Sequence, residues 1–483
     1  MAMRRFLVSA AHKSSGKTTV AVGLAAAMRA RGLAVQTFKK GPDYIDPMWL
    51  TQASGRHCRN LDPFLTDAAE IRTAFARHAA GADVALVEGN KGLYDGLALD
   101  GSNSNAAVAK MLDLPVALVI DARGMTRGIA PLILGYQAFD RDIRIAGVIL
   151  NQLGGSRHEA KLRAVIEHYT DVPVLGTVHH DPRLAIVERQ LGLMPCNEAG
   201  DAAAHIAQIG ATIARQVDID RLLAVAADAS SLAFPSPQSA ATSAAIAPDL
   251  RIGIAQDRAF GFYYADDLDA LNAAGATLVP FDTLADAQLP NVDALIIGGG
   301  FPELFARELE ANGALRERIG AAIDAGLPVY AECGGLMYLA RSLTREGHGY
   351  RMVGAIDGDV VMHERPVGRG YVVLDETPAF PWPTEAQGHS EVRAHEFHYA
   401  SLENLAAETR FAYRVRRGHG IDGERDGIMT KNVLASFTHR RSTERDNWAA
   451  RFVAFIRASG YRQRRARNAA WTGAAAEREV PVG

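Results

Sequence analysis

The amino-acid sequence predicts an α/β protein with two doubly wound domains. Short, continuously apolar segments such as 84–87 and 115–120 alternate with longer segments of helical periodicity. This alternation is typical of parallel strands covered by helices on both faces of a sheet. It stops near residue 224 and resumes at residue 251, and 483 residues are too many for one compact core.

The domain boundaries follow from composition. Residues 224–249 are rich in Ala, Ser and Pro and carry almost no charge, so they are predicted to form a flexible linker. This leaves residues 1–223 and 250–460 as the two domains. The segment 461–483 begins with clustered arginines and then loses all periodicity, so we expect a disordered tail.

Composition argues against several classes of partner. The net charge of -3 gives no electrostatic case for nucleic acid or an anionic membrane. The apolar segments are too short to span a bilayer. Cys58, Cys196 and Cys333 lie far apart and match neither a disulfide framework nor a metal-binding spacing, so we expect a cytoplasmic protein.

A phosphate-binding motif follows the first predicted strand, residues 6–8. A helix with apolar residues at every fourth position begins just behind it. At such a turn, backbone N–H groups and the positive helix end hold a phosphate, Lys17 adds a charge and Thr18 offers a hydroxyl to Mg²⁺. The usual motif has a glycine where Ala11 stands. The predicted phosphate-binding residues are Ser14, Ser15, Gly16, Lys17, Thr18 and Thr19.

Three further positions in the first half end predicted strands or follow them. Asp43 and Asp46 lie in a loop, where they could hold a metal or form turns that cap the next helix. Glu88 ends the apolar strand 84–87, as the second magnesium-holding carboxylate of phosphate-loop proteins does; the alternative is a strand end facing water. Asn151 could contact a purine base or serve as a cap.

The second half contains a predicted nucleophile. Cys333 lies between an apolar strand and two glycines, which indicates a sharp turn that exposes the side chain above the sheet. A helix start behind it favours the nucleophilic form of a thiol. The alternative is a small buried cysteine. Residues 298–300 are all glycine and could leave N–H groups free for an oxyanion, or form a plain tight turn.

A thiol nucleophile needs a base, and His439 is the best placed candidate because it ends the apolar segment 432–438. The segment 395–399 alternates polar and aromatic side chains. It predicts a ligand-facing wall, with a satisfied polar strand pair as the alternative.

These motifs, in this order, resemble the cobyrinate or hydrogenobyrinate a,c-diamide synthases, over nearly all of residues 5–457. The matching motifs are Ser14-Ser15-Gly16-Lys17-Thr18-Thr19, Lys40-Gly41-Pro42-Asp43-Tyr44-Ile45-Asp46-Pro47, Asn60-Leu61-Asp62, Val87-Glu88-Gly89 with Tyr94-Asp95-Gly96, Glu332-Cys333-Gly334-Gly335 and His395-Glu396-Phe397-His398-Tyr399. The resemblance implies an N-terminal P-loop domain similar to dethiobiotin synthetase and a C-terminal class I glutamine amidotransferase domain.

The resemblance also implies roles for individual residues. Residues 14–19 would bind ATP. The implied magnesium ligands are Thr18, Asp43 and Glu88, and the positions linked to catalysis or to the tetrapyrrole are Asp43, Tyr44, Glu88 and Asp95. Cys333 would be the glutaminase nucleophile and His439 its base, with the oxyanion held near Gly299 and Gly334. Amidotransferases of this class often have a glutamate two residues after the histidine, where this chain has Arg441.

The implied activity is ATP- and glutamine-dependent amidation of the a- and c-acetate side chains of a corrin-type tetrapyrrole in cobalamin biosynthesis, through an acyl phosphate. ATP, L-glutamine and a tetrapyrrole carboxylate are the expected partners, and a homodimer is left open. The His12-Lys13-Ser14-Ser15 segment also resembles relatives that amidate sirohaem, and nickel-sirohydrochlorin is a further alternative. An alternative of another class is a P-loop ATPase with a non-catalytic binding module.

Overall fold

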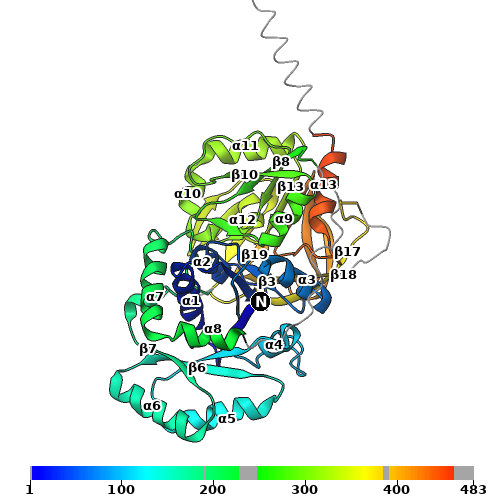
Figure 1. Ribbon diagram of the computed structural model, residues 1–483. Helices are drawn as coiled ribbons and strands as arrows, with labels where there is room; N and C mark the ends of the chain where they lie inside the picture. Colours follow the sequence, from blue (N-terminus) through cyan, green and yellow to red (C-terminus); the bar gives the residue numbers. More distant parts are fainter. Residues whose placement is uncertain (1–2, 190–191, 228–246, 384–390, 462–483) are drawn as a thin grey trace, which may run out of the picture. The chain divides into compact units, whose positions relative to one another are not determined.

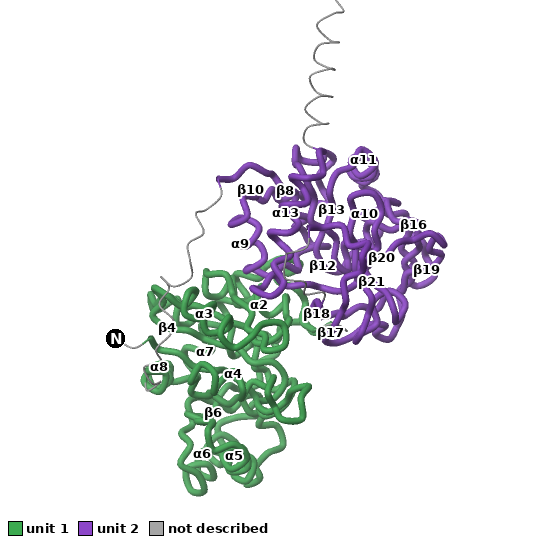
Figure 2. Tube along the Cα trace, turned by 90° about the vertical axis from the view of Figure 1, so that its right-hand side faces the viewer, with its two compact units in different colours: residues 1–242 green, residues 243–483 purple. Residues whose placement is uncertain are grey.

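The computed structural model describes residues 3–189, 192–227, 247–383 and 391–461 (Figure 1). The chain divides into two compact units, residues 1–242 and 243–483 (Figure 2). Residues 228–246 of the expected linker and 462–483 of the expected tail lie outside the described residues. Residues 224–227, which the composition places in the linker, form the end of helix α8 (Ile219–Ala227).

The first unit is built on one sheet of seven strands in the order β3-β2-β4-β1-β5-β6-β7. Every neighbouring pair in it is parallel, as the alternation of apolar strands and helices predicts. The strands are β1 (Arg4–Ala10), β2 (Val35–Lys40), β3 (Arg59–Leu61), β4 (Val84–Glu88), β5 (Val116–Asp121), β6 (Ile145–Leu153) and β7 (Val174–His179).

Helices connect these strands. They are α1 (Lys17–Ala30), α2 (Ile45–Ser54), α3 (Ala68–Ala79), α4 (Asn105–Leu112), α5 (Ile129–Phe139), α6 (Ser156–Tyr169), α7 (Ala202–Gln216) and α8. Helix α1 is buried on most sides rather than along one stripe, because α7 packs against it. A Cβ atom on Gly23 would lie 2.3 Å from Cγ1 of Ile213, so the two helices approach closely there.

The second unit has a mixed nine-stranded sheet in the order β10-β8-β11-β13-β22-β21-β20-β17-β18. Its parallel strands are β8 (Leu250–Ala255), β10 (Ala276–Phe281), β11 (Ala294–Ile297), β13 (Val329–Glu332) and β22 (Val433–Ser436). Its antiparallel strands are β17 (Gly368–Glu376), β18 (Glu391–His398), β20 (Arg410–Arg417) and β21 (Arg425–Thr430). The doubly wound prediction therefore describes the parallel half, whereas the other strands include partly or fully exposed positions and lack the continuous apolar pattern.

Smaller elements surround this sheet. The strands are β9 (Phe260–Phe262) with β12 (Gly299–Gly300), and β14 (Ala340–Arg345), β15 (His348–Arg351), β16 (Ile356–Met362) and β19 (Ala400–Glu403). The helices are α9 (Ala265–Ala273), α10 (Ala306–Ala311), α11 (Gly313–Asp324), α12 (Gly334–Leu339) and α13 (Trp448–Ala458).

Both faces of the central parallel strands are buried. Along β11, Leu295 and Ile297 belong to one hydrophobic cluster, while Ala294 and Ile296 belong to another. Because successive strand side chains point to opposite faces, the two clusters cover the two sides of the sheet. The carboxyl ends of the parallel strands are thereby the places where polar side chains can gather.

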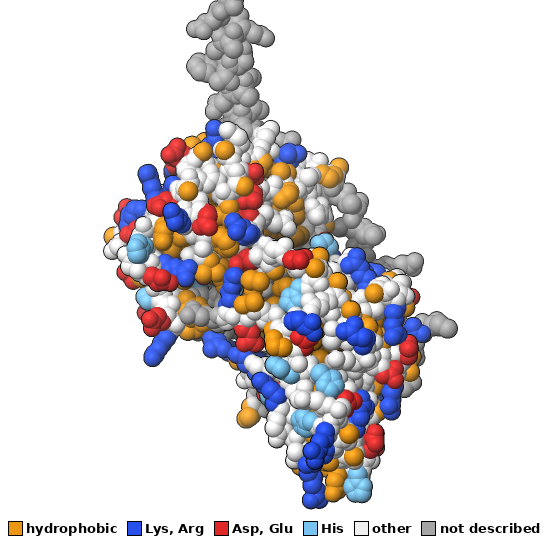
Figure 3. Space-filling view, turned by 90° about the vertical axis from the view of Figure 1, so that its left-hand side faces the viewer, with side chains coloured by type: hydrophobic (Ala, Val, Ile, Leu, Met, Phe, Trp, Pro, Cys, Tyr) orange, Lys and Arg blue, Asp and Glu red, His pale blue; other side chains and the backbone are white. Residues whose placement is uncertain are grey.

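On the face drawn in Figure 3, acidic and basic side chains are interspersed. No helix within the described ranges has both the length and the apolar character needed to cross a bilayer.

Candidate active sites

The phosphate-binding loop connects β1 to α1 and is held from β6. Asn151, in β6, donates from Nδ2 to the carbonyl oxygen of Ser15 at 2.9 Å. Gly16 is left-handed, with φ +78°, and a Cβ atom there would lie 2.1 Å from the same Nδ2. Asn151 therefore supports the loop backbone. The position of Gly16 requires glycine for both its conformation and its space.

Glu88 turns toward this loop rather than toward water. Its side chain is fully buried, and Oε1 accepts hydrogen bonds from the Thr18 hydroxyl at 2.7 Å and from Lys17 Nζ at 3.2 Å. The other carboxylate oxygen, Oε2, is buried and has no hydrogen-bond partner among the described residues. A buried carboxylate oxygen left unsatisfied is costly, so this atom is suited to a cation or a donor supplied by a ligand.

Lys39 lies at the centre of the carboxylates. Its ammonium is buried and contacts Asp46 Oδ2, Glu88 Oε1 at 3.2 Å and Asp43 Oδ2 at 3.7 Å. Burial by itself lowers the pKa of Lys39, but Asp46, Glu88 and Asp43 outweigh it and hold that pKa well above its ordinary value. The lysine is therefore positively charged in this site.

Asp43 has two functions in this arrangement. Its Oδ1 accepts from the N–H groups of Ile45 and Asp46 at 3.0 and 3.1 Å and so caps α2, while Oδ2 faces Lys39. The cap is one of the two alternatives predicted for this residue, and its role as a metal ligand stays a prediction. Burial and the neighbouring Asp46 raise the pKa of Asp43.

Asp46 belongs to the same cluster. Its Oδ2 accepts from the Thr18 hydroxyl at 3.2 Å. Burial works against its charge, but Lys39 and Lys17 hold the pKa of Asp46 below its ordinary value. Hydroxyl and carboxylate oxygens of this kind are the ligands that Mg²⁺ prefers, so the donor set fits that ion.

Tyr44 and Asp95 lie on two different loops of the first unit. Tyr44 precedes α2 and is buried. Asp95 accepts from the N–H of Gly92 at 2.8 Å. A Cβ atom on Gly92 would lie 2.9 Å from both the carbonyl oxygen of Ala11 and Oδ2 of Asp95, so the 89–96 loop passes close to the start of the phosphate loop.

Cys333 occupies the sharp turn that the sequence predicts between β13 and α12. Its backbone has φ +47° and ψ −99°, a sparsely populated conformation for a residue with a side chain. Strain of this kind is typical of functional turns. The turn is anchored by a hydrogen bond from Cys333 N to Ser436 O at 2.7 Å, and the thiol is hydrogen-bonded to the side chain of His439.

The predicted oxyanion glycines lie against this turn. A Cβ atom on Gly334 would lie 3.2 Å from the backbone nitrogen of Gly300, and one on Gly299 would lie 2.6 Å from Cε1 of His439. The Gly-rich loop, the turn and the histidine therefore meet at one place in the second unit.

His439 is buried and held from three sides. Its Nδ1 pairs with Glu332 Oε2 at 3.3 Å, and its ring stacks on His395 with centroids 4.9 Å apart. Burial opposes protonation, but the hydrogen bonds to Cys333 and Glu332 prevail and raise the pKa of His439 to about 10. Burial and the proximity of His439 push the pKa of His395 well below its ordinary value. The arrangement provides an imidazole of raised pKa that can take up the proton of the thiol beside it.

The two faces of the 395–399 segment differ. His395 joins the site and pairs through Nδ1 with the Tyr264 hydroxyl at 3.3 Å. On the other face, Glu396 accepts from the N–H groups of His419 and Gly420 at 2.7 and 2.8 Å, and His398 stacks on Phe437. Glu396 is therefore satisfied, whereas Nε2 of His398 is buried without a hydrogen-bond partner among the described residues, so the satisfied polar pair describes this face only in part.

Family models match both halves of the chain. Residues 7–193 match the CobQ/CobB/MinD/ParA nucleotide binding domain, and residues 251–447 match the CobB/CobQ-like glutamine amidotransferase domain. The chain is 46% identical to a cobyrinate a,c-diamide synthase of Magnetococcus marinus, over 94% of this chain and 98% of that protein. It is 44% identical to one of Methanosarcina acetivorans, over 90% and 92%, and 39% identical to one of Listeria monocytogenes, over 90% and 96%.

The chain belongs to the cobyrinate a,c-diamide synthase family. The resemblance drawn from the sequence motifs is thereby confirmed. So is the predicted fold class, a P-loop nucleotide-binding domain followed by a glutamine amidotransferase domain.

Two residues of the sites were missed by sequence reasoning. Lys39 is buried in β2 next to Lys40, which is also buried, so no local pattern singled it out. Glu332 directly precedes Cys333 at the end of β13, where a carboxylate in a short apolar strand stands out. Arg441, which occupies the position of the glutamate in many amidotransferases, pairs with Asp266 at 2.7 Å.

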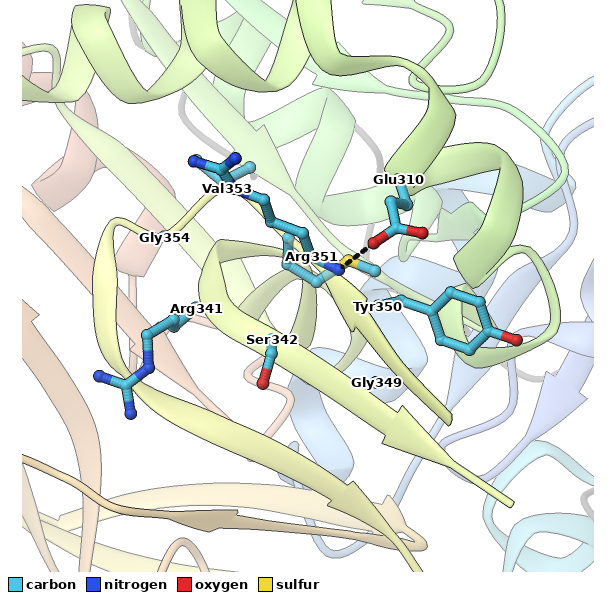
Figure 4. Close-up of a pocket in the computed structure, with 9 residues that line it drawn as sticks. Glu310, Arg341, Ser342, Gly349, Tyr350, Arg351, Val353 and Gly354 are labelled. Atoms are coloured by element: carbon cyan, nitrogen blue, oxygen red, sulfur yellow. Dashed lines mark hydrogen bonds between the residues drawn. The ribbon is translucent and has the colours of Figure 1, made fainter. Parts of the chain in front are cut away.

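A surface hollow of about 670 Å³ lies elsewhere in the second unit, beside β14, β15 and α10 (Figure 4). Glu310 accepts there from the N–H of Arg351 at 2.7 Å. None of the predicted site residues lines this hollow.

Proposed function

We propose that the chain uses ATP and glutamine to amidate the a- and c-acetate side chains of a corrin-type tetrapyrrole, cobyrinate or hydrogenobyrinate, in cobalamin biosynthesis. The observation that carries the proposal is the pairing of Cys333 with His439 in a chain that also has a phosphate loop lined by Lys17. A binding module attached to an ATPase has no need of such a pair. The names of the relatives support the choice of substrate.

The first unit would activate the carboxyl group. A carboxylate does not accept ammonia directly, because its oxygen is a poor leaving group. Transfer of the γ-phosphoryl group from ATP to a carboxylate oxygen gives an acyl phosphate and ADP. Lys17 and the N–H groups of the loop stabilise the charge on the phosphates as this transfer proceeds.

Mg²⁺ is the metal that the oxygen donors of this site fit. Thr18, Asp43 and Glu88 would hold it, and the unpartnered Oε2 of Glu88 supports this assignment. Bound there, the ion supplies positive charge to the phosphate oxygens. Lys39 keeps the cluster of carboxylates from repelling each other.

The second unit would supply the nitrogen. The Cys333 thiol passes its proton to His439 as the sulfur attacks the side-chain amide carbon of glutamine, and the tetrahedral oxyanion is stabilised by N–H groups near Gly299 and Gly334. The carbon–nitrogen bond then breaks while His439 gives a proton to the departing nitrogen, which leaves as ammonia. Water cleaves the remaining thioester to glutamate. Ammonia attacks the acyl phosphate, and inorganic phosphate departs.

The proposal is tested by mass spectrometry of tetrapyrroles incubated with the protein, ATP, Mg²⁺ and glutamine. Cobyrinate, hydrogenobyrinate and sirohaem are compared in parallel. The proposal predicts that the two corrin-type substrates change mass as expected for replacing two hydroxyl groups by amino groups, and that Lys17→Ala abolishes the change. Amidation of sirohaem alone, or ATP turnover without any amide, would contradict it.

A further inference from the structure

We infer that Glu332 is the residue that orients His439 and stabilises its charged form. It takes the place of the carboxylate that the position of Arg441 does not supply. The inference rests on the proposed glutaminase function and names a positioning residue for it.

The contacts of Glu332 place its carboxylate between the histidine and a rigid support. Oε2 faces Nδ1 of His439 at 3.3 Å. Oε1 accepts from the Tyr330 hydroxyl at 2.5 Å and from the backbone N–H of Arg440 at 2.9 Å. Both oxygens are therefore engaged, and the second bond ties Glu332 to the residue that follows His439.

Tyr330, which donates to Glu332, is tightly packed. Tyr330 is almost fully buried, and its ring lies 5.1 Å from that of Trp382 and 4.9 Å from that of Trp448. The Glu332 carboxylate is thus held by a hydroxyl that has little freedom to move. A fixed acceptor holds the imidazole in one orientation and one tautomer.

The backbone explains how adjacent residues reach the same histidine. Successive side chains of a strand point to opposite faces, so Glu332 and Cys333 would normally diverge. β13 ends at Glu332, and the positive φ of Cys333 breaks the alternation. Both side chains can then hydrogen-bond His439. With Nδ1 facing Glu332, the other ring nitrogen is left for the thiol.

The remaining groups around His439 do not replace Glu332. Cys333, Glu332 and His395 are titratable side chains that face the ring. His395 is buried and paired with the Tyr264 hydroxyl, so it adds no negative charge. Arg441 is directed to Asp266 on α9.

The test is Glu332→Gln. The amide oxygen can still accept from Tyr330 and Arg440, but an NH₂ group then faces Nδ1, which forces the wrong tautomer. Glutaminase kcat should fall by about 100-fold or more, as when an orienting acid is made an amide. The KM for glutamine should change little. Loss of a negative charge should also move the alkaline limb of the kcat/KM profile to lower pH, because the imidazolium is less stable. Amidation with ammonia should persist.

Asp426→Asn is the matched control. Asp426 is a fully buried carboxylate that accepts from the N–H groups of Phe437 and Thr438 at 3.1 Å each, so it holds the same segment with no recorded contact to the His439 ring. A structural disturbance in this variant would lower the rate without moving the alkaline limb.

The two variants distinguish an orienting role of Glu332 from a purely structural one. Full glutaminase activity in E332Q, or a loss with an unmoved limb as in D426N, would overturn the inference. If circular dichroism shows that E332Q does not fold, Glu332→Asp is tested in its place. Its shorter carboxylate should lower the glutaminase kcat, and an unchanged kcat would overturn the inference. A native protein without any glutaminase activity would instead contradict the proposed function.

Discussion

Asn151 and Ser15 join the end of β6 to the phosphate loop, through a hydrogen bond from Nδ2 to the carbonyl oxygen at 2.9 Å. The asparagine lies 136 residues further along the chain. It also occupies the space in which a side chain on Gly16 would have to fit. The conformation of the loop therefore depends on the packing of the sheet as well as on its own sequence.

Gly16→Ala should lower the affinity for ATP by at least about tenfold, because a left-handed alanine costs roughly 1–2 kcal/mol and its Cβ also displaces Asn151. Isothermal titration calorimetry with ATP measures the effect. Gly32→Ala is the matched control, since Gly32 has φ +83° but open space around it. An equal loss of affinity in both variants would contradict the role of the close contact.

Lys39→Met should destabilise the metal-free protein by about 3–5 kcal/mol, because it leaves buried carboxylates without their cation. Added Mg²⁺ should then raise the melting temperature of the variant more than that of the native protein. Thermal unfolding with and without Mg²⁺ checks both effects. Lys40→Met is the control, because Lys40 is buried beside this cluster with no recorded ion pair to it. A variant as stable as the native protein would contradict the assigned role of Lys39.

Lys40 predicts a pH dependence of stability. Burial, opposed by Asp62 and reinforced by Lys91 and Lys39, lowers the pKa of Lys40 to about 8. Above that pH the unfolded chain binds more protons than the folded one, so the unfolding free energy contributed by this site rises with pH. The stability of the native protein relative to Lys40→Met should increase by about 2 kcal/mol between about pH 7.5 and about pH 9.5. Urea denaturation at the two pH values measures it, and a constant difference would contradict the prediction.

Gly299→Ala should reduce glutaminase activity by about 100-fold, because its Cβ would lie 2.6 Å from Cε1 of His439 and displace the ring. Amidation with ammonia should be retained. Gly320→Ala serves as the control, since its Cβ would lie no closer than 3.8 Å to the carbonyl oxygen of Val353. Comparable losses in the two variants would show that the contact with His439 is not responsible.

The sequence predicts the parts of the sites that are contiguous in the chain. Lys17 and Thr18 belong to one motif, and Cys333 is recognisable by the strand before it and the glycines after it. Lys39 could not be assigned in this way, because its contact with Glu88 depends on the register of β2 beside β4. The contact of Glu332 with His439 likewise depends on β13 pairing with β22.

Contacts between distant parts of the chain also explain where the fold differs from the prediction. The burial of α1 depends on α7, which lies far along the chain, and no local pattern reports it. The antiparallel strands β17, β18, β20 and β21 include partly or fully exposed positions, so they do not show the continuous apolar pattern that predicts the parallel strands.

The central claim is that nitrogen released at Cys333 is consumed at a carboxyl group activated by ATP. It is tested most directly by supplying Cys333→Ala with a corrin-type substrate, ATP and Mg²⁺, and with either glutamine or ammonium as the nitrogen source. Mass spectrometry of the tetrapyrrole is the measurement. The account predicts amide product with ammonium and none with glutamine. Amide product from glutamine at the native rate would contradict it.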